Sequence, residues 1–171
     1  MPPVFLCDAM LGGLARWLRA AGYRAEFDVH MEDGELVRRG KEEGKIIVTS
    51  DADILARYAV REELVRTIYI PHGMSPIEQL SRVMQDMGLE LRAPRCMECG
   101  GVLKGVDGET VTDRVPDRVR RRFEDFFRCA GCNKVYWRGS HWEDIQQKLH
   151  WAAGHREEGG SAGRFCGTGP D

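Results

Sequence analysis

The sequence lacks long apolar runs and a basic N-terminal stretch. None of its apolar segments approaches the about 20 residues that a membrane-spanning helix needs. The opening MPPVFLCDAML also lacks the basic start and extended apolar stretch of a secretory signal. We therefore expect a cytoplasmic protein with no membrane partner, and the sequence carries no indication of its oligomeric state.

Three familiar catalytic or nucleotide-binding motifs are also missing. There is no Walker-type phosphate loop, no Gly-x-Ser-x-Gly elbow and no Gly-x-Gly-x-x-Gly fingerprint, and the glycines of MLGGLARWLR have the wrong spacing for the last of these. Excess positive charge is absent as well, because 25 Lys and Arg face 27 Asp and Glu. This balance argues against a protein that coats nucleic acid, although it leaves room for local basic patches.

What the sequence does contain is an alternation of strand-like and helix-like segments. Short apolar runs at 4–7, 23–27, 45–50 and 66–70 are typical of strands. Between and after them, residues 11–22, 35–44, 53–63 and 75–88 have helical spacing, and the last of these helices begins with Ser75 as cap and Pro76 at its first position. This order predicts an α/β fold in which a parallel sheet carries helices on its faces.

The composition changes after Gly88, where Pro, Gly and Cys gather. We predict a first domain at 1–90 and a small cysteine-dependent module at 91–151. Residues 152–171 are predicted to form a disordered tail, because the chain from Gly154 onward has almost no apolar content.

Aspartates follow three of the predicted strands. Asp8, Asp28 and Asp51 stand at strand ends, and Asp53 is close behind Asp51. Ligands of open α/β sheets bind outside the carboxyl ends of the strands. Carboxylates gathered there repel one another unless a hard cation such as Mg²⁺ or Mn²⁺ binds them. The pattern therefore indicates an acidic metal site, with Asp28, Asp33 and Glu35 as competing candidates for its middle position.

Helix capping is the alternative explanation for the same aspartates. Asp8, Asp33 and Asp51 each precede a predicted helix, and Ser50-x-x-Asp53 fits a capping-box pattern. If the metal site exists, its carboxylates suit metal-assisted hydrolysis of a phosphodiester. Arginines on adjacent helices would then contact phosphates, although an exposed helix face is the commoner role for such residues; they are Arg16, Arg19 and Arg57.

Two Cys-x-x-Cys pairs predict a structural zinc site. Cys96 and Cys99 form one pair, and Cys129 and Cys132 form the other. Four thiolates complete a tetrahedral Zn²⁺ site and leave no open position for catalysis. In so small a module, zinc binding would supply much of the folding free energy. Cys7 and Cys166 have no evident partner.

A basic and aromatic segment lies between the two cysteine pairs. Its arginines include Arg120, Arg121 and Arg122, and three phenylalanines follow them at positions 123, 126 and 127. Arginines beside aromatic rings are typical of single-stranded nucleic-acid surfaces. A small hydrophobic core is the other use for the phenylalanines, and nearby acidic residues dilute the positive charge.

Three segments in this order resemble the Mut7-C RNase family: FLCDAMLGGLARWLRAAGY, IIVTSDADIL and FRCAGCNKVYWRGSHW. The resemblance runs from about Val4 to Trp151. It implies a PIN-like three-layer α/β/α sandwich with a zinc ribbon, and activity on RNA at an acidic divalent-metal site. By position, Asp8, Asp33 and Asp51 match the family's acidic residues, and the four cysteines match its zinc ligands.

Two positions depart from the family pattern. Ser50 stands where the family usually has an arginine, and Arg24 stands where it has an aspartate. The leading hypothesis is a ribonuclease that depends on Mg²⁺ or Mn²⁺, with Asp8, Asp33 and Asp51 in its site and Asp53 as a fourth candidate. In this hypothesis the zinc ribbon, with Arg16 and Arg120 to Arg122, helps to hold RNA. The alternative is a non-catalytic RNA-binding or ribosome-associated adaptor.

Overall fold

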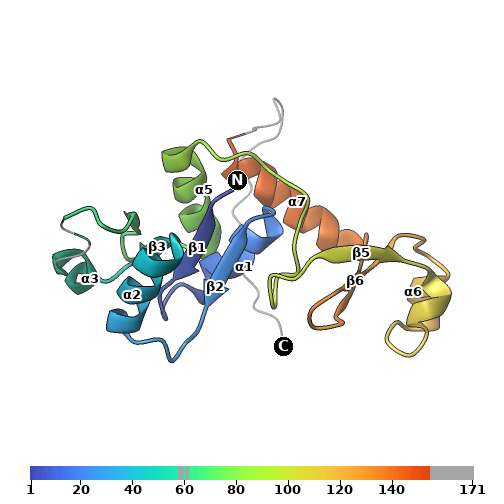
Figure 1. Cartoon of the computed structure of the whole chain (residues 1–171). Helices are drawn as coiled ribbons and strands as arrows, with labels where there is room; N and C mark the ends of the chain where they lie inside the picture. The colour runs from blue at the N-terminus through green and yellow to red at the C-terminus, as the bar shows by residue number, and fades with distance from the viewer. Residues whose placement is uncertain (58–59, 61, 155–171) are drawn as a thin grey trace.

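A parallel four-stranded sheet forms the centre of the molecule. The computed structural model describes residues 1–57, 60 and 62–154. The strands are β1 (Val4–Cys7), β2 (Arg24–Phe27), β3 (Ile46–Thr49) and β4 (Thr67–Tyr69), in the order β2-β1-β3-β4 (Figure 1). The predicted α/β fold is thereby confirmed.

Helices cover both faces of this sheet, which gives three layers. On one face lie α1 (Gly12–Ala20), α5 (Pro76–Met87) and α7 (Ser140–Ala152); on the other lie α2 (Asp33–Glu43) and α3 (Ala52–Ala56). Side chains along a strand point alternately to opposite faces. Phe5 and Cys7 accordingly join the core under α1, whereas Leu6 between them joins the core under α2.

The helix ends follow the local signals in the sequence. Helix α2 stops at Gly44, whose φ of 62° is the left-handed conformation that glycine adopts without strain. Helix α5 starts with a capping box between Ser75 and Glu78, with Pro76 as its first residue. Helix α3 ends at Ala56, and the predicted continuation of this helix includes residues 58, 59 and 61, which lie outside the described residues.

Helix α7 follows the cysteine module but packs into the core of the sandwich. Its residues Ile145, Leu149 and Ala152 are buried in the same cluster as Phe5 and Leu14. Figure 1 shows the helix running from the cysteine module to the side of α5, which it contacts together with α1. The chain therefore leaves the sandwich after α5 and returns to it through α7. Most of the predicted tail, residues 155–171, lies outside the described residues.

The cysteine module is a three-stranded antiparallel sheet. Its strands are β5 (Leu103–Val106), β6 (Phe126–Cys129) and β7 (Val135–Trp137), in that order. The short helices η1 (Gly108–Val111) and α6 (Asp117–Arg120) precede β6. Val111, Val115 and Phe126 form a separate small core with this sheet. Among the residues that the structure describes, no helix is long and apolar enough to cross a membrane.

Candidate acidic and zinc sites

Asp8 and Asp51 follow neighbouring strands. Strands β1 and β3 pair in parallel, with Cys7 opposite Val48, and the Asp8 N–H donates to the Val48 carbonyl oxygen at 3.0 Å. Both aspartates therefore come after the carboxyl ends of adjacent strands in the middle of the sheet. This is the edge at which open α/β sheets bind their ligands.

The Asp8 carboxylate is held in one orientation by three donors. Its Oδ2 accepts hydrogen bonds from the Thr49 hydroxyl and from the Ser50 N–H, the latter at 2.9 Å. Its Oδ1 accepts from the Met10 N–H at 2.9 Å. The residue is only 6% exposed. The expectation that Asp8 caps the following helix is wrong, because α1 is capped at Leu11 and Asp8 instead stabilises the turn before it.

Thr49 is a site residue that sequence reasoning missed. It is fully buried, and its hydroxyl also accepts a hydrogen bond from the Asp51 N–H at 2.9 Å. One side chain thus connects the two aspartates. The only signal in the sequence is a hydroxyl residue at the end of a strand of Ile and Val, which reads equally well as an ordinary β-branched position.

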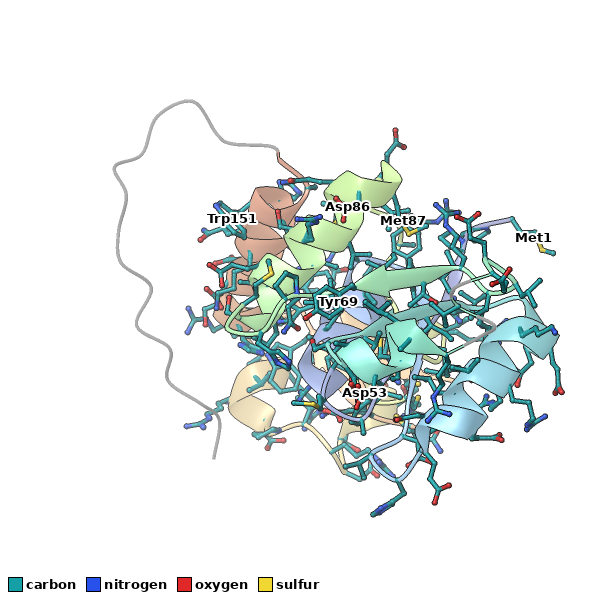
Figure 2. The ribbon with its side chains drawn as sticks, turned by 90° about the vertical axis from the view of Figure 1, so that its left-hand side faces the viewer. Met1, Asp53, Tyr69, Asp86, Met87 and Trp151 are labelled. Atoms are coloured by element: carbon teal, nitrogen blue, oxygen red, sulfur yellow. The ribbon has the colours of Figure 1, made fainter. Side chains whose placement is uncertain are left out.

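Asp51 does cap a helix, as the alternative explanation proposed. Its Oδ1 accepts from the Asp53 N–H at 2.8 Å at the start of α3. The expected capping box from Ser50 is wrong, since the cap residue is Asp51. Asp53 is exposed in the first turn of α3 (Figure 2).

Asp33 lies at the start of α2 and bridges to α3. Its Oδ2 is 3.3 Å from Nη2 of Arg57, the residue directly after α3. The competing candidates are engaged locally. Asp28 accepts from the His30 N–H at 2.9 Å. A hydrogen bond from Arg38 lowers the pKa of Glu35 from its ordinary value.

The aspartates are more widely spaced than the cysteines. Among the described residues, the four cysteines alone form a group of three or more Asp, Glu, His or Cys with ligand atoms mutually within 4.8 Å. The oxygen donors of the aspartates are nevertheless the type that Mg²⁺ and Mn²⁺ prefer. A carboxylate that already accepts hydrogen bonds keeps lone pairs for a cation. The acidic metal site therefore stays a prediction.

The four cysteines are placed for a metal ion, as predicted. The Sγ atoms of Cys99 and Cys129 are 3.3 Å apart, and those of Cys96 and Cys132 are 3.6 Å apart. A Cβ at Gly101 would lie 2.7 Å from the Cys129 sulfur, so only glycine fits that turn. Four thiols around one point match the tetrahedral donor set of a structural zinc.

The surroundings of Cys96 favour its thiolate, the form that binds metal, whereas burial raises the pKa of the Cys99 thiol. Burial raises the pKa of the Cys96 thiol, but hydrogen bonds from the Tyr136 hydroxyl and from the backbone of Cys99 and Glu98 outweigh it and bring the pKa to about 6. Tyr136 Oη lies 3.0 Å from this sulfur. The Gly131 N–H donates to the Cys129 sulfur at 3.3 Å.

The comparison with family models decides the classification. The model of the Mut7-C RNAse domain matches residues 3–149, which include both the sandwich and the cysteine module. The chain belongs to this family. No curated protein and no solved structure matched it.

In this Mut7-C domain, Arg19 joins the sandwich to the turn between Cys96 and Cys99. The residue is 7% exposed, and its Nε donates to the Ala25 carbonyl oxygen at 2.8 Å. Its Nη1 donates to the carbonyl oxygens of Met97 at 3.1 Å and Glu98 at 2.6 Å. The expectation that Arg19 contacts phosphates is wrong, because its guanidinium is buried against backbone carbonyls.

The other arginines expected at the nucleic-acid surface lie in separate places. Arg16 pairs with Glu98 at 3.3 Å. In the cysteine module, which is called the ribbon from here on, Arg120 pairs with Asp117. The Arg122 guanidinium is 5.5 Å from the centre of the Phe123 ring. Arg121 is exposed. Their contact with RNA stays a prediction.

Proposed function

We propose that this protein is a metal-dependent ribonuclease that hydrolyses RNA phosphodiester bonds. Its membership of the Mut7-C RNAse family supports the class of activity. The observation that carries the proposal is the position of Asp8 and Asp51 after the neighbouring parallel strands β1 and β3, with Thr49 bonded to both residues. The position of these carboxylates at the ligand-binding edge of the sheet gives the reaction a site.

The proposed metal ligands are Asp8 and Asp51, with Asp33 and Asp53 completing the acidic group. Mg²⁺ or Mn²⁺ suits these oxygen donors, and a bound divalent ion supplies an activated water and neutralises charge on the phosphate. The Thr49 hydroxyl and the Ser50 N–H fix the Asp8 carboxylate, so it needs little reordering to bind a cation.

Arg57 has a positioning role in the same proposal. Its side chain is 45% exposed, and its guanidinium pairs with Asp33 at 3.3 Å. An arginine at this place attracts the RNA phosphate and also limits the repulsion between Asp33 and the other carboxylates. The zinc ribbon has no catalytic part in the proposal, because its four thiolates leave no open coordination position.

The test is cleavage of a labelled single-stranded RNA by the purified chain with Mn²⁺, with Mg²⁺ and with neither. Asp8→Asn and Asp51→Asn each remove one carboxylate charge and are expected to lower the rate by about 100-fold or more. Asp86→Asn on α5 removes the same charge and serves as the control, because Figure 2 shows Asp86 well apart from Asp53. Unchanged cleavage in both site variants would contradict the proposal.

One observation favours a second candidate, a non-catalytic RNA-binding adaptor. Asp51 has a sufficient structural reason to be present, since its carboxylate caps α3. In an adaptor the wild-type chain binds RNA but does not cleave it with any divalent ion. In that case Asp51→Asn leaves RNA binding unchanged and lowers only the stability.

A further inference from the structure

One face of the ribbon sheet carries aromatic side chains outside the hydrophobic clusters. Phe126 and Trp137 are cross-strand neighbours and belong to the small ribbon core. Because side chains alternate along a strand, Phe127 and its neighbour Tyr136 lie on the opposite face. Gly105 is opposite Phe127 on β5 and adds no side chain there. In the described chain, neither Phe127 nor Tyr136 belongs to a core cluster, and both are only half-buried.

Cations accompany both rings. The Arg138 guanidinium is 5.6 Å from the centre of the Phe127 ring, and the Lys134 ammonium is 6.0 Å from the centre of the Tyr136 ring. Each cation also has an acidic neighbour. Arg138 pairs with Asp125 at 3.3 Å, in a pair whose side chains are both more than half exposed, and Lys134 pairs with Glu98 at 2.7 Å. Exposed pairs of this kind are weak and open readily to another anion.

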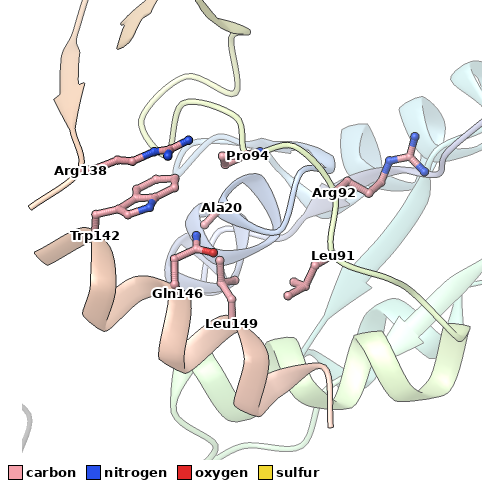
Figure 3. Close-up of a pocket in the computed structure, with 8 residues that line it drawn as sticks. All are labelled: Ala20, Leu91, Arg92, Pro94, Arg138, Trp142, Gln146 and Leu149. Carbon is pink, nitrogen blue, oxygen red and sulfur yellow. The ribbon is translucent and has the colours of Figure 1, made fainter. Parts of the chain in front are cut away.

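Arg138 also lines a cavity of about 380 Å³ where the ribbon meets the sandwich. Arg92, Trp142 and Gln146 supply its other polar and aromatic groups, and its remaining four lining residues are apolar. Figure 3 shows the Trp142 indole beside the Arg138 guanidinium, with the Gln146 amide one turn further along α7. None of the eight lining residues is acidic; the Arg138 guanidinium lies beside Trp142, whereas the Arg92 guanidinium extends away from the cavity (Figure 3).

We propose that this junction, formed by the cavity and the adjoining ring of Phe127, binds single-stranded RNA. A base stacks on Trp142 and is read by the Gln146 amide, the next base stacks on Phe127, and Arg92 and Arg138 contact the phosphates. Half-exposed aromatic rings between arginines suit this ligand, because bases need a flat apolar partner and phosphates need cations. The cavity volume is in the range of small-molecule sites and accommodates a nucleobase.

The junction lies at the opposite end of α1 from the acidic edge. Helix α1 begins four residues after Asp8, and its last residue, Ala20, lines the cavity. Nine helical residues span about 13 Å. RNA held at the junction must therefore run along α1 to reach Asp8 and Asp51. This step rests on the proposed function, and it predicts that the junction promotes cleavage of oligonucleotides but contributes nothing to cleavage of a dinucleotide, which is too short to reach both sites.

Binding is measured with a fluorescent 20-nucleotide oligo(U) and the full-length, zinc-loaded chain, without added Mg²⁺ or Mn²⁺ so that no cleavage interferes. Arg92→Gln combined with Arg138→Gln is expected to weaken binding by tenfold or more. Two lost phosphate contacts should also reduce the slope of log K against log salt by about 1.4. Lys41→Gln on α2 combined with Arg82→Gln on α5 removes the same charge from two exposed positions of the sandwich and is expected to change the affinity less than twofold.

Trp142→Leu tests stacking while it keeps an apolar side chain on α7. It is expected to weaken binding by about tenfold. Trp151→Leu is the matched control, because Trp151 lies on the same helix with an indole that is 45% exposed. It should change the affinity less than twofold. Circular dichroism and zinc content confirm that each variant is folded.

Two results would overturn the junction proposal. One is the absence of RNA binding by the wild-type chain. The other is unchanged binding in both junction variants. If the wild-type chain cleaves RNA while the junction variants bind normally, the proposed function stands and the junction fails. If binding depends on the junction but no divalent ion supports cleavage, the junction stands and the proposed function fails.

Discussion

The Arg19 guanidinium donates to the carbonyl oxygen of Glu98 across 2.6 Å, which connects a helix of the sandwich to the turn between Cys96 and Cys99, two members of the four-cysteine group. The backbone carbonyl of Arg19 also accepts from the Arg95 N–H at 2.9 Å. One residue thus makes contacts from both its side chain and its main chain. The sandwich and the turn between Cys96 and Cys99 are therefore held relative to each other by a buried cation whose side chain donates three hydrogen bonds to carbonyl oxygens.

Replacement of Arg19 by Met should lower the free energy of unfolding by about 2–4 kcal/mol, because three buried carbonyl oxygens lose a charged donor. We also expect zinc to dissociate from the variant faster, since the turn between Cys96 and Cys99 loses its hydrogen bonds to Arg19 of α1. Urea unfolding and zinc transfer to a chromogenic chelator measure the two effects. Arg82→Met on α5, which removes an exposed ion pair, should cost less than about 0.5 kcal/mol.

Thr49→Val should weaken divalent-metal binding and RNA cleavage while the fold is retained. The valine keeps the shape and β propensity of the side chain but removes the hydroxyl that holds Asp8 and accepts from the Asp51 N–H. We expect a stability loss of about 1–2 kcal/mol. Thr67→Val on β4, whose hydroxyl bonds only weakly to the Val65 carbonyl oxygen at 3.4 Å, is the control. Equal activity losses in the two variants would argue against a special role for Thr49.

Zinc should bind with one equivalent per chain, and its removal should unfold the ribbon. Cys129→Ser is expected to abolish stoichiometric zinc, because the fully buried Cys129 sulfur belongs to the four-thiol group. Cys7→Ala should keep the full equivalent, since Cys7 is buried in the sandwich core. Metal analysis and near-ultraviolet circular dichroism before and after chelation check this. A full equivalent of zinc in Cys129→Ser would contradict the assignment of Cys129 as a zinc ligand.

Acid should remove a stabilising contribution of Glu43 between about pH 4.5 and pH 2. Hydrogen bonds from Arg39 and Lys45 lower the pKa of Glu43 from 4.5 to about 2. A carboxylate with a depressed pKa stabilises the folded state above its unfolded value and loses that effect as the pH falls through the folded value.

The stability difference between the wild-type chain and Glu43→Gln should therefore be largest at pH 6 and should shrink as the pH falls toward 2. Urea unfolding at several pH values measures it. The side chain is exposed, so 1 M salt should reduce the difference at pH 6. A difference that is independent of pH would exclude this explanation.

The strands and helices of the three layers were predictable from the sequence, because each strand or helix signal lies within a few consecutive residues. The apolar strands and the Ser75-Pro76 helix start required no knowledge of distant contacts. The roles of Arg19 and Phe127 were not predictable in this way. Whether an arginine is buried depends on which carbonyls fold against it, and the side to which Phe127 points depends on the register of β6 with β7.

The acidic residues show the same limit. Asp8 and Asp51 were identified from their place after strands and before helices, and Asp33 was selected from the family resemblance; the structure shows a capping role for Asp51 and a turn role for Asp8. Sequence spacing contains no information on the distance between carboxylates from different strands. Their distances depend on sheet order and helix packing, which are properties of the whole fold.

The packing of α7 against α1 and α5 constrains when the sandwich can finish folding during synthesis. The buried residues Ile145, Leu149 and Ala152 leave the ribosome after every strand of both sheets, yet the main core includes them. A nascent chain that ends before α7 exposes an apolar surface on α1 and α5. The sandwich therefore cannot complete its folding until the ribbon and α7 have been synthesised. While that surface is exposed, aggregation or chaperone binding competes with folding.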